Sequence, residues 1–95
     1  MALLEEIYHQ LRSAGLVSCA EAFSKDYLGK NSNWYSYQRH TGRDFSIGAA
    51  VQCLRSLRIQ QRCEGLTPVQ VDTLQHAATN LLAYLIEHHS VSDVC

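Results

Sequence analysis

The sequence predicts an all-α protein, a compact five-helix domain that spans residues 1–95. Apolar residues recur every three to four positions, and no stretch alternates with the period of two that a half-buried strand requires. One proline and five glycines in 95 residues leave few interruptions. A hydrophobic content of 46% is enough for the modest core of one small domain.

The first two expected helices lie before residue 30. The first ends at Gly15, a typical C-terminal cap, and the second begins at Ser18 and ends at Gly29. Ser18 and Glu21 have the spacing of a capping box, in which each side chain accepts a first-turn N–H. Cys19 of this helix and Cys53 further along the chain are expected to be small buried residues. The expected inward residues are Leu3, Leu4, Ile7, Tyr8 and Leu11, followed by Ala20, Phe23 and Tyr27.

Three further helices complete the prediction. Asn31 or Ser32 caps a short helix that runs to about residue 40 and that Gly42 can end, and Ser46 caps the next one. The last helix spans about 67–89, where Thr67 and Gln70 form a second capping box. The expected inward residues are Ile47, Ala50, Val51, Leu54 and Leu57, with Ile59 as a further candidate, then Val71, Leu74, Ala78, Leu81, Leu82 and Leu85.

Charge is distributed very unevenly along the chain. Residues 25–62 hold seven Lys or Arg and two acids, a net charge of +5, whereas the remainder carries −6. No acid occurs between Asp26 and Asp44, where cations and large aromatic side chains are interleaved. This polarity indicates either solvated helix faces that cluster by chance or a surface that meets a negatively charged partner.

Several functional classes lack support in the sequence. No apolar run has the ~20 residues of a membrane span, and Glu5 and Glu6 stand where a signal peptide needs basic residues, so we expect a cytoplasmic protein. The four cysteines are then expected to be reduced. No nucleophile elbow, phosphate loop or metal motif occurs, so we expect no enzyme, no cofactor and no metal.

The middle of the chain resembles the lambda-repressor and Cro superfamily, the XRE-type helix-turn-helix proteins. The stretches "SCAEAFSKDYLG" and "NSNWYSYQRHTG" correspond to the two helices of the motif, over about residues 18–41, and "RDFSIGAAVQCLRSL" corresponds to the next turn and helix. The sequence departs from the pattern in one spacing, since the distance to Gly42 is one residue longer than usual, and at three positions. Lys25 stands where a small residue is usual, Lys30 where an apolar one is, and Phe45 where proline is common.

The resemblance implies that the second motif helix enters the major groove of double-stranded DNA. Tyr35 is its best inward residue, flanked by Trp34 or Gln38. Asn and Arg side chains suit base edges, and Lys and Arg suit phosphates. The residues expected to contact DNA are Lys30, Asn31, Ser32, Asn33, Ser36, Arg39, His40, Arg43 and Arg55.

Two functions therefore compete. The leading hypothesis is a small DNA-binding transcriptional regulator. The alternative is a protein-binding inhibitor or antitoxin-like module of phage or bacterial type, of the anti-CRISPR kind, which grips a host or partner protein with the same helices. The apolar stripe of the last helix also predicts a homodimer. Its expected interface residues are Leu74, Leu81, Leu82 and Leu85.

Overall fold

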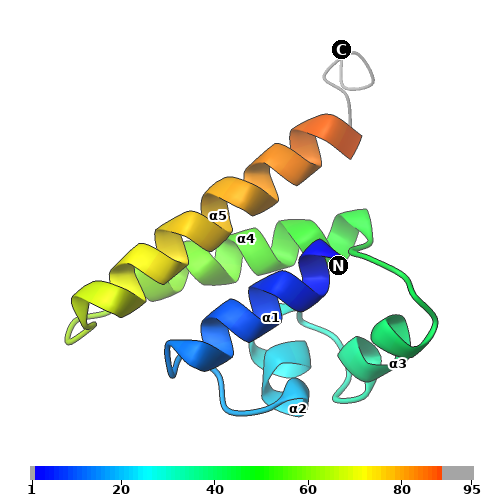
Figure 1. Ribbon diagram of the computed structural model, residues 1–95, viewed down its shortest axis with the longest axis horizontal. Coiled ribbons are helices and arrows are strands. Elements are labelled where there is room, and N and C mark those ends of the chain that lie inside the picture. The colour runs from blue at the N-terminus through cyan, green and yellow to red at the C-terminus, as the bar shows by residue number, and fades with distance from the viewer. Residues whose placement is uncertain (1, 89–95) are drawn as a thin grey trace.

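The computed structural model describes residues 2–88 and confirms the all-α prediction (Figure 1). It contains five α-helices, and these residues include no strand. The second helix continues directly into a π-helical turn, η1. The elements are α1 (Leu3–Ser13), α2 (Ala20–Ala22), η1 (Phe23–Tyr27), α3 (Trp34–His40), α4 (Ile47–Gln61) and α5 (Pro68–His88).

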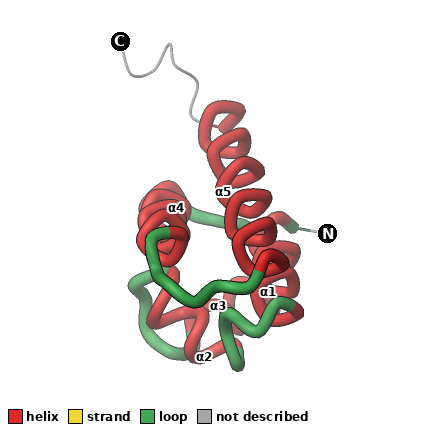
Figure 2. The backbone as a smooth tube through the Cα atoms, turned by 90° about the vertical axis from the view of Figure 1, so that its left-hand side faces the viewer, coloured by secondary structure: helices red, strands yellow, loops and turns green. Residues whose placement is uncertain are grey.

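The helices surround one core. The two longest, α4 and α5, are joined by a short loop and lie side by side, running in opposite directions (Figure 1). In the end-on view of Figure 2, α1 lies on the side of α5 away from α4, and α2 and α3 lie below all three. The completely buried apolar side chains, with no exposed surface, are Leu4, Ile7, Leu11, Phe23, Ala49, Ala50, Cys53, Leu57, Leu74, Ala77 and Leu81.

Helix ends follow the sequence in some places and not in others. The Ser46 hydroxyl accepts the Ala49 N–H at 3.3 Å, and Thr67 and Gln70 exchange two bonds of 3.1 Å, so both expected caps are confirmed. The capping box at Ser18 is wrong. Because α2 starts one residue later than expected, Cys19 takes the N-cap position, with no side-chain cap. The cap expected from Asn31 or Ser32 is also wrong, since Asn33 occupies that position without a side-chain bond.

The inner face of α4 differs from the expected one. Ala50 and Leu57 are buried as predicted, but Ile47, Val51 and Ile59 are exposed. The buried line instead includes the small residues Ala49, Cys53 and Ser56. Short side chains let neighbouring helices approach closely, and α4 packs against both α5 and η1. The larger aliphatic side chains are consequently left on the outer surface of α4.

The inner face of α5 is narrower than the sequence stripe. Leu74 and Leu81 are fully buried and Leu85 is half-buried, whereas Val71 and Leu82 are exposed. A stripe of six residues on a 21-residue helix covers more angle than its neighbours can shield. No helix in the described part of the chain combines the length and hydropathy that crossing a membrane would require.

Candidate functional site

The candidate site is built around α3, which is anchored by its inner face. Tyr35 is 2% exposed, and its ring centroid lies 4.6 Å from that of Tyr8 and 5.4 Å from that of Phe23. One turn later, Gln38 is also buried, and its side-chain amide donates to the Asp44 carbonyl at 3.1 Å. The prediction that Tyr35 and Gln38 face inward is therefore confirmed.

A buried serine fixes the crossing of η1 and α3. The Ser24 hydroxyl donates to the Ala20 carbonyl and accepts the Tyr35 N–H, both at 3.0 Å. It thereby satisfies one of the first-turn donors of α3, which has no side-chain cap of its own. The π turn contains one more residue per turn than an α-helix would, so Ser24 faces α3 and Lys25 points to solvent.

The turn between η1 and α3 rests on α4. Gly29 has φ +64°, a left-handed conformation that disfavours side chains, and a Cβ there would lie 3.1 Å from Gln52 Cγ. Gln52 is therefore positioned directly under the turn. Arg55 follows it by three residues, so it is a neighbour of Gln52 on the α4 surface. Arg55 thus lies near the turn that carries Lys30 and Asn31.

Asp44 links this region to α1, a role that no sequence pattern indicated. Its carboxylate accepts the N–H groups of Leu3 at 3.0 Å and Leu4 at 2.9 Å, and also that of Phe45 at 2.8 Å. The N-cap residue of α1 is Ala2, which offers no side-chain acceptor. Asp44 thus caps α1 from about 40 positions away and ties the end of α3 to it. An aspartate that follows a glycine turn is the only sequence signal.

The residues expected to contact DNA lie on α3, on its flanking turns and, for Arg55, on α4. All of them are exposed except Ser32, which is half-buried. Ser36, Arg39 and His40 line one open hollow of about 420 Å³. Of the residues expected to contact DNA, those exposed on α3 and its flanking turns are Lys30, Asn31, Asn33, Ser36, Arg39, His40 and Arg43.

Two of these cations already have intramolecular neighbours. The Arg39 guanidinium Nε lies 3.8 Å from Glu5 Oε1, and 61% of the arginine side chain remains exposed. The Lys30 ammonium lies 5.9 Å from the centroid of the half-buried Trp34 ring. Exposed pairs of this kind contribute about 0–1 kcal/mol. Both cations are therefore accessible to a stronger anionic partner.

A family model described as "Family of unknown function (DUF6626)" matches residues 4–94. The chain belongs to this family. The match includes both the α3 region and α5, so it covers the candidate site completely. No curated protein and no solved structure matches the chain significantly.

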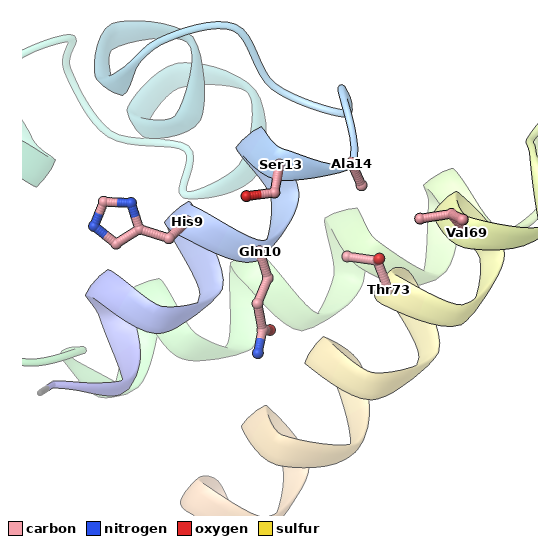
Figure 3. A pocket seen from close by; sticks show the side chains of 6 residues that line it. All are labelled: His9, Gln10, Ser13, Ala14, Val69 and Thr73. Carbon is pink, nitrogen blue, oxygen red and sulfur yellow. The ribbon is translucent and has the colours of Figure 1, made fainter.

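A second hollow lies between α1 and α5 in this DUF6626 chain. It has a volume of about 350 Å³, and its lining contains no Asp, Glu, Lys or Arg (Figure 3). His9 points away from α5, so its imidazole does not converge with Thr73. Gln10 Oε1 is the only buried acceptor without a partner among the described lining residues. The lining therefore offers no set of groups that converge on a ligand.

The cysteines differ sharply in environment. Cys53 is fully buried, as expected, and burial raises the pKa of its thiol to about 12. Cys19 is exposed, contrary to expectation, because it precedes the first turn of α2. A hydrogen bond from the Ala22 backbone lowers the pKa of its thiol. Cys19, Cys53 and Cys63 are free, and Cys95 lies outside the described residues. Within residues 2–88, no cluster of His, Cys, Asp or Glu is placed to hold a metal.

The expected dimer residues fall into two groups. Leu74 and Leu81 have no exposed surface, because the chain's own core uses them. They cannot contact a second chain unless that core opens, so both are removed from the expected interface. Leu82 is 41% exposed and Leu85 is half-buried, and these two are accessible to a partner.

Proposed function

We propose that this chain is a small DNA-binding transcriptional regulator that inserts α3 into the major groove. One observation carries the proposal. The inner face of α3 packs on the core, so Ser36, Tyr37, Arg39 and His40 on its outer face are exposed, and residues 27–43 contain no acid. The order of η1, turn and α3 is the order that the resemblance to helix-turn-helix proteins implies, and this supports the proposal. The family match is to a family of unknown function and so does not bear on the proposal.

The outer face offers two kinds of contact. Asn33 and Ser36 lie near the start of α3, and Arg39 lies one turn further on. Amide and guanidinium groups of this kind recognise base edges in pairs of hydrogen bonds. Lys30 precedes the helix and Arg43 comes after it. At those flanks a cation neutralises phosphates and contributes affinity that does not depend on sequence.

Glu5 opposes this function in a way that can be measured. It lies 3.8 Å from Arg39 and would be brought towards the phosphate backbone when α3 docks. Removing its charge frees the guanidinium and lowers the local negative potential. Glu5→Gln is therefore expected to strengthen DNA binding at low salt, with a smaller effect at high salt because exposed charges are screened.

The test is a mobility shift of the purified chain on a pool of genomic fragments, at low and at moderate salt. Retained fragments then serve as probes for variants. Asn33→Ala and Arg39→Ala should each weaken specific binding by about 1–3 kcal/mol. Lys30→Ala should weaken binding to all DNA sequences alike, and the slope of log K against log salt concentration should become less steep by about one. Arg12→Ala removes a cation from the far end of α1 and should change neither the affinity for DNA nor its salt dependence. If no fragment is retained even at low salt, the proposal fails.

A protein-binding role is the second candidate, and Tyr37 favours it. This side chain is 58% exposed on α3, and a large exposed tyrosine is typical of binding hot spots between proteins. In that case the same surface grips a host or partner protein, as an inhibitor or antitoxin-like module does. Tyr37→Ala should then abolish capture of the partner while the fold is retained, and the chain should retain no DNA.

Both candidate functions place the chain in the cytoplasm. Neither role requires a cofactor. The exposed Cys19 and Cys63 thiols are compatible with a reducing compartment. Fractionation of cells that express the tagged chain would test this location, and recovery outside the cytoplasmic fraction would contradict it.

A further inference from the structure

Exposed aliphatic side chains collect on one surface of the molecule. Within residues 2–88, eight large hydrophobic side chains are exposed, and five of them lie on α4 and α5 along the open side of their seam. We propose that this surface binds a second copy of the chain. We call it the hairpin strip, and define it by Ile47, Val51 and Leu54 of α4 and Val71, Leu82 and Ile86 of α5.

On α4, the neighbouring contacts show which edge is free. Gln52 lies under Gly29, and the Gln60 amide donates to the Tyr27 hydroxyl at 3.2 Å, so this edge of α4 is covered by η1 and its turn. Ile47, Val51 and Leu54 have the spacing i, i+4, i+7. Such residues share one face of a helix, and this face lies on the opposite edge of α4, beside α5.

On α5, the same reasoning applies. The Gln70 amide bonds the Ala14 carbonyl, and Val69 lines the hollow shared with α1, so this edge is covered by α1. Val71 and Leu82 are eleven residues apart, three helical turns, and therefore lie on one line. Their line is on the edge of α5 away from α1. The open edges of α4 and α5 consequently adjoin, and in Figure 2 neither α1 nor α2 nor α3 lies over them.

The chemistry of the hairpin strip selects an apolar partner. Arg58 continues the α4 line by one turn and is the strip's charged neighbour, and no acid lies on either line. Phosphate groups or an acidic protein would leave the aliphatic side chains unused. A two-fold axis through the middle of the strip lays α4 of one copy against α5 of the other. The interface then contains four helices, α4 and α5 of each copy, and the hairpin strip of each copy is buried against that of the other.

The size of the strip fits a weak dimer. The 15 residues of α4 are about 22 Å long, and two adjacent helices are about 20 Å wide. Each copy thus offers roughly 450 Å², and two copies about 900 Å², which is about a quarter below the 1,200 Å² at which stable interfaces begin. We therefore expect a dissociation constant in the micromolar range, about 10–100 µM.

Sedimentation equilibrium of the full chain without DNA, from about 1 to 500 µM, tests the proposal. The wild type should pass from the 10.7 kDa monomer to twice that mass. Ile47→Glu should raise the dissociation constant at least about tenfold, because it buries a charge in the interface. Ile59→Glu is the matched control. Ile47 and Ile59 are 56% and 63% exposed on the same helix, but Ile59 lies outside the strip.

Leu82→Glu provides an independent variant on α5 and should also raise the dissociation constant of the dimer at least about tenfold. Circular dichroism should show unchanged helix content in all three variants, since each replaces an exposed side chain. A monomer at every concentration overturns the proposal, as does equal weakening by Ile47→Glu and Ile59→Glu. Sedimentation equilibrium and circular dichroism are both measured without DNA, so a failure of the dimer proposal is distinguishable from a failure of the proposed function.

Discussion

Replacement of Asp44 by alanine is expected to destabilise the fold strongly for a substitution in a loop. The carboxylate accepts three N–H groups at 2.8–3.0 Å, and two of them belong to the first turn of α1. Loss of an N-cap side chain costs about 0.5–2 kcal/mol, and hydrogen bonds to charged groups contribute about 1.5–3 kcal/mol each. Because Asp44 is half-buried, water can hydrogen-bond some of the N–H groups that the substitution leaves free, and this reduces the loss. We expect about 2–3 kcal/mol.

Urea unfolding followed by circular dichroism measures this cost, and thermal melting provides a second reading. For a chain of this size, each kcal/mol shifts Tm by about 4–8 °C, so Tm should fall by roughly 10–20 °C. Asp44→Asn keeps one acceptor oxygen without the charge and should lose about half as much. Asp26→Ala is the control, because Asp26 is exposed, and it should stay within about 0.5 kcal/mol of wild type. If Asp44→Ala is no worse than this control, the cap does not stabilise α1.

Three further predictions concern tyrosine hydroxyls and cysteine thiols. The Tyr35 hydroxyl is buried without a partner, whereas that of Tyr27 donates to the Leu16 carbonyl and accepts from Gln60. Urea unfolding should therefore show that Tyr35→Phe is neutral or stabilising by up to about 1 kcal/mol and that Tyr27→Phe loses about 1–2 kcal/mol. The opposite order would refute the assignment. Burial and the nearby Glu5 charge raise the pKa of Tyr35 to about 12. Above pH 10 the unfolded tyrosine ionises first, so wild type should lose stability between pH 10 and 12 and Tyr35→Phe should lose less. Iodoacetamide near pH 8 should modify Cys19 before Cys53, since the Cys19 pKa is lowered and that of Cys53 is raised to about 12. Peptide mapping would contradict this if Cys53 reacted in the folded state.

Local patterns predicted the helices and several of their ends. The caps at Ser46 and at Thr67 with Gln70 involve residues three positions apart, so the spacing alone contains the geometry. Gly42 ends α3 as expected, with φ +71° and its N–H bonded to the Arg39 carbonyl. The inward position of Tyr35 also agrees with helical periodicity. For the candidate site, the same periodicity accounts for the exposure of Ser36, Arg39 and His40 on α3.

Other features depended on partners distant in sequence. Ser18 has the composition of a cap, but the chain bends at Cys19, so the hydroxyl meets no helix N–H. In the sequence, Ile47, Val51 and Ile59 have the same apolar character as Leu57, and only the position of α5 decides which are shielded. Asp44 is indistinguishable from a solvated loop aspartate until α1 is placed beside it. The ion pair of Arg39 with Glu5 likewise joins two helices that the sequence separates.

The sequence by itself therefore determined the all-α class, the number of helices and the concentration of cations around α3. These properties come from periodicity, turn residues and composition, which act over a few positions. The tertiary structure alone decided that Ser24 instead of Lys25 meets α3, that Asp44 caps α1, and that Leu74 and Leu81 serve the chain's own core. Each of these depends on which helix lies opposite. A helix face has no fixed inside until a neighbour covers it, because burial is a property of pairs of surfaces.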